Sequence, residues 1–142
     1  MARRTTVIAG AALVAAGAAA ALSTADASAA PRIHTQHFHA RATAQLATGK
    51  TSFVLAEQDV IGARVIGHDV LFCSATRTHS TCHIAFAQGG GLIYARFLLR
   101  DSDHTARGRV TGGTGQYSHA HGTITARLLS PTDVVVDLRY RD

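Results

Sequence analysis

Apolar and polar residues alternate in short runs after residue 31, and no run shows the three-to-four residue spacing of a helix. Alternation with a period of two, β-branched residues within the runs, and Gly- or Ser-rich clusters between them predict strands joined by turns. The predicted strands are Ile33–Thr48, Ser52–Glu57, Ile61–Cys73, Cys82–Ala87, Leu92–Arg100, Thr105–Thr111, Tyr117–Leu129 and Val134–Arg141. Because the connections are short, consecutive strands should pair antiparallel in a meander.

Pairing the strands across their turns gives one consistent apolar face. If Cys73 lies opposite Cys82, the hairpins on either side bring apolar residues together on the same side of the sheet. That face carries Leu71, Ile84, Phe86, Ile93, Ala95, Phe97, Leu99, Ala106 and Val110. The opposite face carries His68, His83, Tyr94, Arg96, Arg100, Arg107 and Arg109. A shift of one residue would exchange the two faces, so their agreement across three turns supports the register.

An apolar face of this length can close into a barrel or stack as a sandwich. The Gly-rich meander favours an eight-stranded antiparallel β-barrel, whose closure removes exposed edge strands. Such a barrel holds packed side chains or one small ligand. The predicted cavity residues are Leu71, Ile84, Phe86, Ile93, Ala95, Phe97, Leu99 and Val110. Small inner residues, Ala95, Ala106 and Gly108, either leave room for a ligand or accommodate Phe86 and Phe97.

The first 29 residues have the pattern of a helical secretory signal peptide. Arg3 and Arg4 precede an uncharged, Ala-rich run from Val7 to Leu22, and small residues follow up to Ala29. The run is shorter than the roughly 20 residues of a membrane span. We therefore predict a secreted, extracellular protein, exported by the general or the twin-arginine route. After cleavage, residues 30–50 form an N-terminal segment and first strand, and 51–142 the remainder of one domain.

The charge of the chain argues against nucleic acid as a partner. The full chain has 14 Lys and Arg, 9 Asp and Glu, and a net charge of +5. Loss of Arg3, Arg4 and Asp26 with the signal peptide lowers that charge to +4. The remaining cations are spread singly, without the basic run or interleaved aromatic residues of a nucleic-acid surface. We expect a solvated surface that binds neither nucleic acid nor, after cleavage, a membrane.

Cys73 and Cys82 are the only cysteines. A zinc site would need two further ligands at suitable spacing, and a redox pair usually has two intervening residues rather than eight. In an exported protein, two cysteines this close in sequence most often form a disulfide. We predict a structural Cys73–Cys82 disulfide.

Asp69 is the one carboxylate that this register places on the inner face. A buried Asp69 would have a raised pKa and would be a candidate general acid. Alternatively, its position beside Gly67 near the strand end would place it at the solvated rim of the barrel. We expect the rim position.

His34, His37 and His39 form the densest histidine cluster. They are the best metal-ligand candidates among the nine histidines, because His37 and His39 share one face of a strand. A catalytic zinc needs three ligands and an oriented outer shell, and no carboxylate lies nearby in sequence. We therefore expect an exposed His-rich segment, with no metal and no cofactor.

The facing of His119 and His121 depends on the turn before them. A direct continuation of the register turns both inward and sends Ile124, Ala126 and Leu128 outward. A β-bulge in the glycine-rich turn reverses this arrangement. We predict the bulge, which places both histidines outside.

Residues 110–122, VTGGTGQYSHAHG, resemble the V-x-GGTG-x-[YF]-x-x-A-x-G motif of the allene oxide cyclase and dirigent barrel superfamily. The motif positions are Gly112, Gly113, Thr114, Gly115, Tyr117, Ala120 and Gly122. The similarity extends over about residues 50–140, and the Cys pair and Gly-rich hairpin resemble secreted actinobacterial members. The resemblance implies an eight-stranded barrel, a hydrophobic cavity and, often, a homo-oligomer. Some relatives steer the stereochemistry of cyclisations or phenoxy-radical couplings.

The dirigent resemblance also implies candidate catalytic residues. Plant dirigent proteins have an acidic residue at a strand end before GGTG, and Asp101 lies near that position. They also have an arginine six residues before the first glycine, where this chain has Ala106, with Arg107 adjacent. Asp101, from this resemblance, and Asp69, from the strand register, are the catalytic candidates, and the missing arginine is a departure from the family pattern.

These observations favour a secreted barrel that binds a small apolar molecule or a partner. The alternative is a cyclase or dirigent-type protein whose hydrophobic cavity steers a reaction, an isomerase-like activity implied by the resemblance. A third interpretation is a structural protein with a filled barrel. The content of the cavity distinguishes them: a dry void favours binding, a void with an interior polar group favours catalysis, and a packed core favours a structural role.

Overall fold

The computed structural model describes residues 31–141. The predicted signal peptide, residues 1–29, lies outside the described residues. The described part of the chain contains eight strands and one short 3₁₀ helix. Among these residues, no helix is long and apolar enough to cross a membrane.

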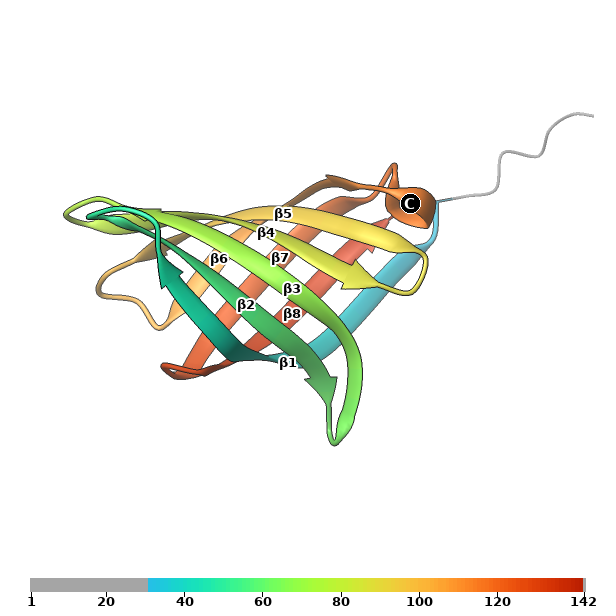
Figure 1. The fold of residues 1–142 in the computed structure, drawn as a ribbon. Coiled ribbons are helices and arrows are strands. Elements are labelled where there is room, and N and C mark those ends of the chain that lie inside the picture. Colours follow the sequence, from blue (N-terminus) through green and yellow to red (C-terminus); the bar gives the residue numbers. More distant parts are fainter. Residues whose placement is uncertain (1–30, 142) are drawn as a thin grey trace, which may run out of the picture.

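The strands follow one another around a closed antiparallel barrel (Figure 1). They are β1 (Ile33–Ala47), β2 (Ser52–Ile61), β3 (Arg64–Ala75), β4 (His79–Gln88), β5 (Gly91–Arg100), β6 (Thr105–Gly113), β7 (His121–Ser130) and β8 (Asp133–Arg141), with η1 (Gly115–Tyr117) between β6 and β7. Each strand pairs with its neighbours in sequence, and β1 pairs with β8 to close the sheet. The predicted eight-stranded antiparallel meander is confirmed.

The register predicted from the apolar face is confirmed between β3 and β6. Cys73 lies opposite Cys82, and Phe97 lies opposite both Cys82 and Gly108. Alternate residues of these strands are buried, as their period of two requires.

A bulge interrupts the pairing of β5 with β6 at Thr111, just before the glycine-rich turn in which one is predicted, and the pairing of Val110 with Gly122 sets the facing of β7. Tyr94 pairs with Gly112 and Ala95 with Val110, so one residue of β6 has no partner. His119 and His121 are exposed, while Ile124 and Ala126 in β7 are buried. Both histidines lie outside the barrel, as predicted. Residues 117–120, predicted as part of a strand, instead form the end of η1 and a turn.

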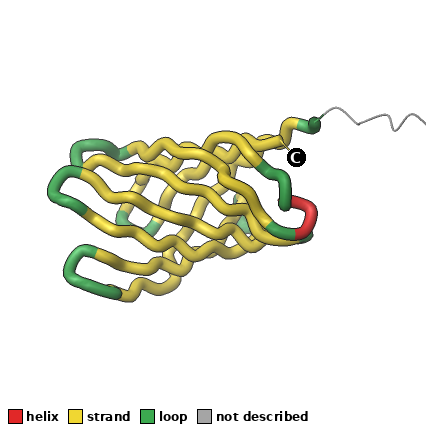
Figure 2. Tube along the Cα trace, turned by 90° about the horizontal axis from the view of Figure 1, so that it is seen from above, coloured by secondary structure: helices red, strands yellow, loops and turns green. Residues whose placement is uncertain are grey.

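The two ends of the barrel differ. One end, which we call the closed end, carries η1 and the turns β2–β3, β4–β5 and β6–β7. The other, the open end, carries the turns β1–β2, β3–β4, β5–β6 and β7–β8 (Figure 2). Near the closed end the interior is packed with large side chains, Phe38, Phe86, Ile93 and Leu138, each at most 1% exposed. Phe38 and Phe86 meet edge to face, with ring centroids 5.7 Å apart.

The GGTG motif builds the closed end. The Thr114 hydroxyl accepts a hydrogen bond from the Leu92 amide at 3.0 Å, and the Tyr117 hydroxyl donates to the Gly89 carbonyl at 3.0 Å. Gly115 has φ +59°, and a Cβ there would lie 2.2 Å from the Gly90 carbonyl oxygen. Only glycine fits this conformation and this close approach. The motif therefore holds η1 against the β4–β5 turn and contributes to the fold.

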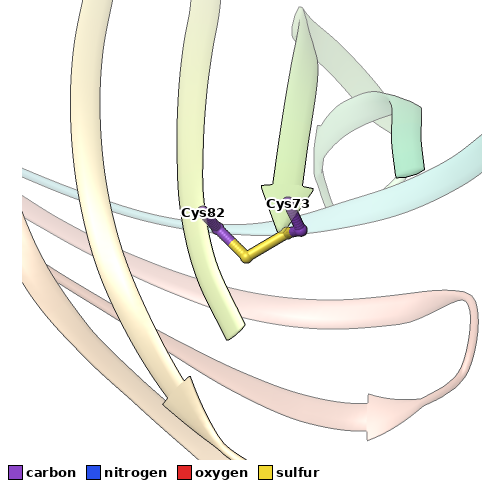
Figure 3. Close-up of a disulfide and its surroundings, with 2 residues drawn as sticks. All are labelled: Cys73 and Cys82. Carbon is purple, nitrogen blue, oxygen red and sulfur yellow. A yellow bond between two sulfur atoms is a disulfide. The ribbon is translucent and has the colours of Figure 1, made fainter. Parts of the chain in front are cut away.

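Cys73 and Cys82 form the predicted disulfide, with Cα atoms 4.1 Å apart. It joins β3 to β4 near the open end, and its sulfur atoms lie on the inner face of the sheet (Figure 3). The described residues contain no free cysteine. A disulfide persists in an oxidising compartment such as the extracellular space.

The packing near the closed end predicts a contrast between two substitutions. Phe86→Ala removes a fully buried aromatic ring and should lower the free energy of unfolding by about 3–5 kcal/mol. Arg64→Ala, at the exposed start of β3, should change it by no more than about 0.5 kcal/mol. Urea unfolding of the disulfide-bonded proteins measures both. Equal effects of the two substitutions would contradict the assignment of the interior.

Candidate active site at the open end of the barrel

A cavity of about 240 Å³ occupies the barrel interior at the open end. Its wall is mostly apolar and includes Phe53, Leu55, Ile124, Val134 and Val136, together with both disulfide cysteines. Alanines at positions 40, 106 and 126 leave the space that larger side chains would fill. Exposed polar residues, Gln45 and Ser130, stand at the rim. The cavity is therefore an apolar chamber with a polar entrance.

The residues predicted to line a cavity divide between the two halves of the barrel. Leu71, Ile84, Phe97 and Leu99 line the cavity. Phe86, Ile93, Ala95 and Val110 are buried inside the barrel but lie outside the cavity wall, in the packed part of the interior. The sequence pattern predicts which side chains point into the barrel. It does not predict which part of the interior the large side chains fill.

Three carboxylates, Glu57, Asp59 and Asp69, lie inside the barrel on β2 and β3, and we call them the carboxyl cluster. Glu57 is directly opposite Asp69, and Asp59 follows Glu57 by two residues on the same face. Their exposed fractions are 6%, 0% and 2%. Glu57 lines the cavity, whereas Asp59 and Asp69 lie outside its wall. The cluster therefore reaches the chamber through Glu57.

Gly67 provides the room for the Asp59 side chain. It lies opposite Asp59, and a Cβ at position 67 would be 3.2 Å from Asp59 Oδ2 and 2.5 Å from the Ala87 carbonyl oxygen. Any larger residue would press on both the carboxylate and the β4 backbone. The glycine thus allows the Asp59 carboxylate to be accommodated inside the barrel.

Burial and mutual repulsion keep protons on the carboxyl cluster. Burial raises the pKa of Asp69 to about 10, and the negative charges of Glu57 and Asp59 add to the increase. Burial also raises the pKa of Glu57, although the Asp69 carboxyl, acting as a donor when protonated, offsets part of this. The pKa of Asp59 is raised by burial and lowered in part by Asp69 and by His68. At neutral pH, Asp69 is therefore a neutral carboxylic acid.

No cation neutralises the carboxyl cluster. Among residues 31–141, none of the three carboxylates has an Arg, Lys or His nitrogen within 4.0 Å. Outside the cluster, no group of the described residues hydrogen-bonds to Asp59 or Asp69. Buried acids without such partners destabilise a fold, and they are concentrated at sites that need a shifted pKa. The arrangement can donate a proton to a molecule in the cavity and accept one back.

The structure corrects two expectations about this region. Asp69 is expected at the solvated rim, but it is buried, because it faces the interior of the closed barrel. The predicted strand ended at Glu57, so Asp59 was missed as an inner residue. The signal was the alternation Phe53, Leu55, Glu57, Asp59, which continues one face of β2 through the two acids.

The other catalytic candidates lie apart from the carboxyl cluster. Asp101 is exposed in the β5–β6 turn at the open end, outside the cavity wall. Arg107 is exposed on the outer face of β6, and Ala106 is buried at the position of the dirigent arginine. The structure therefore does not assemble the dirigent-type acid and arginine here.

The histidine candidates separate to the two faces of β1. His34 stacks on Tyr140, with ring centroids 5.0 Å apart. His37 Nδ1 lies 2.6 Å from Asp137 Oδ1, and His39 Nδ1 lies 2.8 Å from Asp133 Oδ1. Within residues 31–141, no group of three or more His, Cys, Asp or Glu side chains is placed to hold a metal ion. His37 and His39 instead link β1 to β8 on the outer surface.

The raised pKa of Asp69 predicts how stability depends on pH. Below about pH 4, Asp69 is protonated in both the folded and the unfolded chain. As the pH rises, the unfolded chain loses this proton while the folded chain keeps it up to about pH 10, so the free energy of unfolding falls. Asp69→Asn removes this titration. It should increase stability at pH 7–8 by about 1–3 kcal/mol and leave it nearly unchanged at pH 4.

Urea unfolding between pH 4 and pH 8 measures the effect of Asp69→Asn. Asp101→Asn, on the exposed turn, is the matched control. Its free energy of unfolding should vary with pH in the same way as that of the wild type. If the free energy of unfolding of Asp69→Asn varies with pH in the same way as that of the wild type, the buried proton does not reside on Asp69.

Three solved structures share the barrel fold. A pyocyanin demethylase aligns with a TM-score of 0.63 at 18% identity, over 75% of this chain and 99% of that chain. AbnU, an exo-specific intermolecular Diels-Alderase, aligns with a TM-score of 0.59 at 11% identity, over 80% of this chain and 98% of that chain. A pterocarpan synthase dirigent protein aligns with a TM-score of 0.52 at 17% identity, over 78% of this chain and 84% of that chain.

These similarities concern the fold. No protein-family profile matches the sequence, and no curated protein matches it. The resemblance drawn from the GGTG motif is supported at the level of architecture, since a dirigent protein is among the structural neighbours. The chain has a dirigent-like, eight-stranded antiparallel barrel fold.

Proposed function

We propose that the protein binds a small, largely apolar molecule in the open-end cavity and catalyses a redox-neutral cyclisation or isomerisation of it. The observation that carries this proposal is the carboxyl cluster at the inner end of an apolar chamber. An interior polar group beside a void was the feature expected to distinguish a catalyst from a dry binding pocket. Glu57 is the residue that contacts the bound molecule.

The size of the cavity limits the ligand. Its volume of about 240 Å³ is below the range of roughly 300–1,000 Å³ common for sites that enclose drug-sized ligands. The bound molecule is therefore small, or it projects through the rim near Gln45 and Ser130. The apolar wall favours a hydrocarbon or aromatic body, and Glu57 favours an oxygen at its inner end.

The chemistry proposed for the carboxyl cluster is proton transfer. Asp69 holds a proton at neutral pH directly opposite Glu57, so Glu57 can pass a proton to an oxygen of the substrate. The substrate forms its new bond and returns a proton from carbon or oxygen to the same carboxylate. Protons and electrons balance within one turnover, and no oxidant, reductant or cofactor is consumed. The shape of the chamber selects which face of the substrate reacts.

The structural neighbours support a catalytic function more than non-catalytic binding. They include a Diels-Alderase, a pterocarpan synthase dirigent protein and a pyocyanin demethylase. Each performs or steers a reaction on a small molecule. Non-catalytic binding in the same cavity is the second candidate, supported by the largely apolar wall.

The test begins with the molecules that accompany the protein. Untargeted mass spectrometry of small molecules released from the purified protein identifies candidate substrates and products. Ala126→Phe, which fills the cavity, should abolish their retention. Glu57→Gln keeps the shape of the cavity, so it should retain binding and reduce turnover by about 10²–10⁴-fold, the usual contribution of a general acid or base. Wild-type turnover in Glu57→Gln would exclude the proton-transfer role and leave non-catalytic binding.

We also propose that the protein is exported and that cleavage of residues 1–29 leaves Ala30 as the first residue. The signal-peptide pattern and the disulfide support this location. The intact mass of protein from the culture supernatant should correspond to a chain that begins at Ala30 or within a few residues of it, with no free thiols. A full-length mass there, or retention in membranes, would contradict export with cleavage.

A further inference from the structure

Three arginines that are scattered in the sequence gather on the outer face of β5 and β6. Arg96 on β5 lies directly opposite Arg109 on β6, and Arg107 lies opposite Leu98. All three arginines are exposed. In sequence they are isolated cations, and the pairing of the two strands makes them neighbours.

These arginines border a groove of about 400 Å³. Phe97, Leu98 and the two threonines Thr81 and Thr111 also line it. Gly108 lies at its base, where a Cβ would be 2.0 Å from the Arg96 carbonyl oxygen. Because β5 and β6 approach this closely only with glycine at that position, Gly108 helps to hold Arg96 and Arg109 side by side. We call this feature the arginine groove.

No acid of the described residues neutralises the positive charge of the arginine groove. Within residues 31–141, no Asp or Glu oxygen lies within 4.0 Å of a guanidinium nitrogen of Arg96, Arg107 or Arg109. The acids that face outward on β8, Asp133 and Asp137, are engaged by His39 and His37. Like charges directly opposite each other on a sheet are destabilising, with Cβ atoms about 4.5–5.5 Å apart. An anion between Arg96 and Arg109 would convert this repulsion into attraction.

We propose that the arginine groove binds a phosphate group. Guanidinium groups donate paired hydrogen bonds that match a tetrahedral oxyanion, and two facing arginines can hold one phosphate from both sides. The Thr81 hydroxyl can donate a further hydrogen bond at the edge of the groove, whereas the Thr111 hydroxyl donates to the Tyr94 carbonyl. Leu98, 42% exposed beside the groove, can contact an apolar body attached to the phosphate. The site is on the outer face of the barrel, so the proposal is independent of the function proposed for the cavity.

Calorimetric titration of the disulfide-bonded protein tests the proposal with two probes, inorganic phosphate and phenyl phosphate. Chloride keeps the ionic strength constant, so that general screening does not contribute. Arg96→Gln and Arg109→Gln should each weaken binding of both probes by tenfold or more. Arg64→Gln removes the same charge from the distant β2–β3 hairpin and should leave the Kd unchanged.

Thermal unfolding provides a second readout that does not depend on heat of binding. Phosphate should raise the Tm of the wild type above its value in matched chloride, because a ligand that binds only the folded state stabilises it. Arg109→Gln should lose this increase. Without phosphate at low ionic strength, it should be more stable than the wild type because the opposed pair is gone.

The outcomes separate the alternatives. Tighter binding of phenyl phosphate than of inorganic phosphate identifies an organic phosphomonoester as the ligand, and equal binding identifies the free anion. The proposal is overturned if phosphate acts no differently from chloride, or if Arg64→Gln weakens binding as much as Arg109→Gln. Either result would show a diffuse positive field in place of a site.

Discussion

Pairing of β1 with β8 is the constraint on which the rest of the structure depends. It runs from Ile33 opposite Arg141 to Arg41 opposite Asp133, and it turns an open meander into a closed wall. Once the sheet is closed, alternate side chains of every strand point either into one interior or to solvent. A residue on the inner face then has no route to water except through the open end. Burial of the carboxyl cluster, and so its retained protons, follows from this closure.

The interior is divided by the sizes of the inward side chains. Large residues such as Phe38 and Phe86 fill the half near the closed end, where η1 and the GGTG motif seal it. Alanines at positions 40, 106 and 126 leave the other half hollow. The GGTG motif therefore stabilises the end of the barrel opposite the chamber. The residues proposed to act on a ligand come instead from β2 and β3.

Two features of the barrel reduce its stability in the absence of a ligand. The carboxyl cluster places Glu57 and Asp69 opposite each other in an apolar interior, and the arginine groove places Arg96 opposite Arg109 on the surface. In each case like groups face each other across a strand pair, and the described residues offer no counter-charge. A retained proton relieves the first arrangement, and the anion that we propose would relieve the second. Their positions on opposite faces of the wall allow two ligands without overlap.

The sequence by itself determined the number and order of the strands, the register from β3 to β6, the disulfide and the side of the sheet on which most residues lie. These follow from local alternation and short turns, which act between neighbours in the chain. Only the tertiary structure decided that Asp69 is buried beside Glu57 and Asp59, because that depends on how far β2 continues and on closure of the barrel. Closure likewise decided that His37 and His39 meet Asp137 and Asp133, about a hundred residues away. The packing of distant strands, rather than any local pattern, set where the interior is filled and where it is hollow.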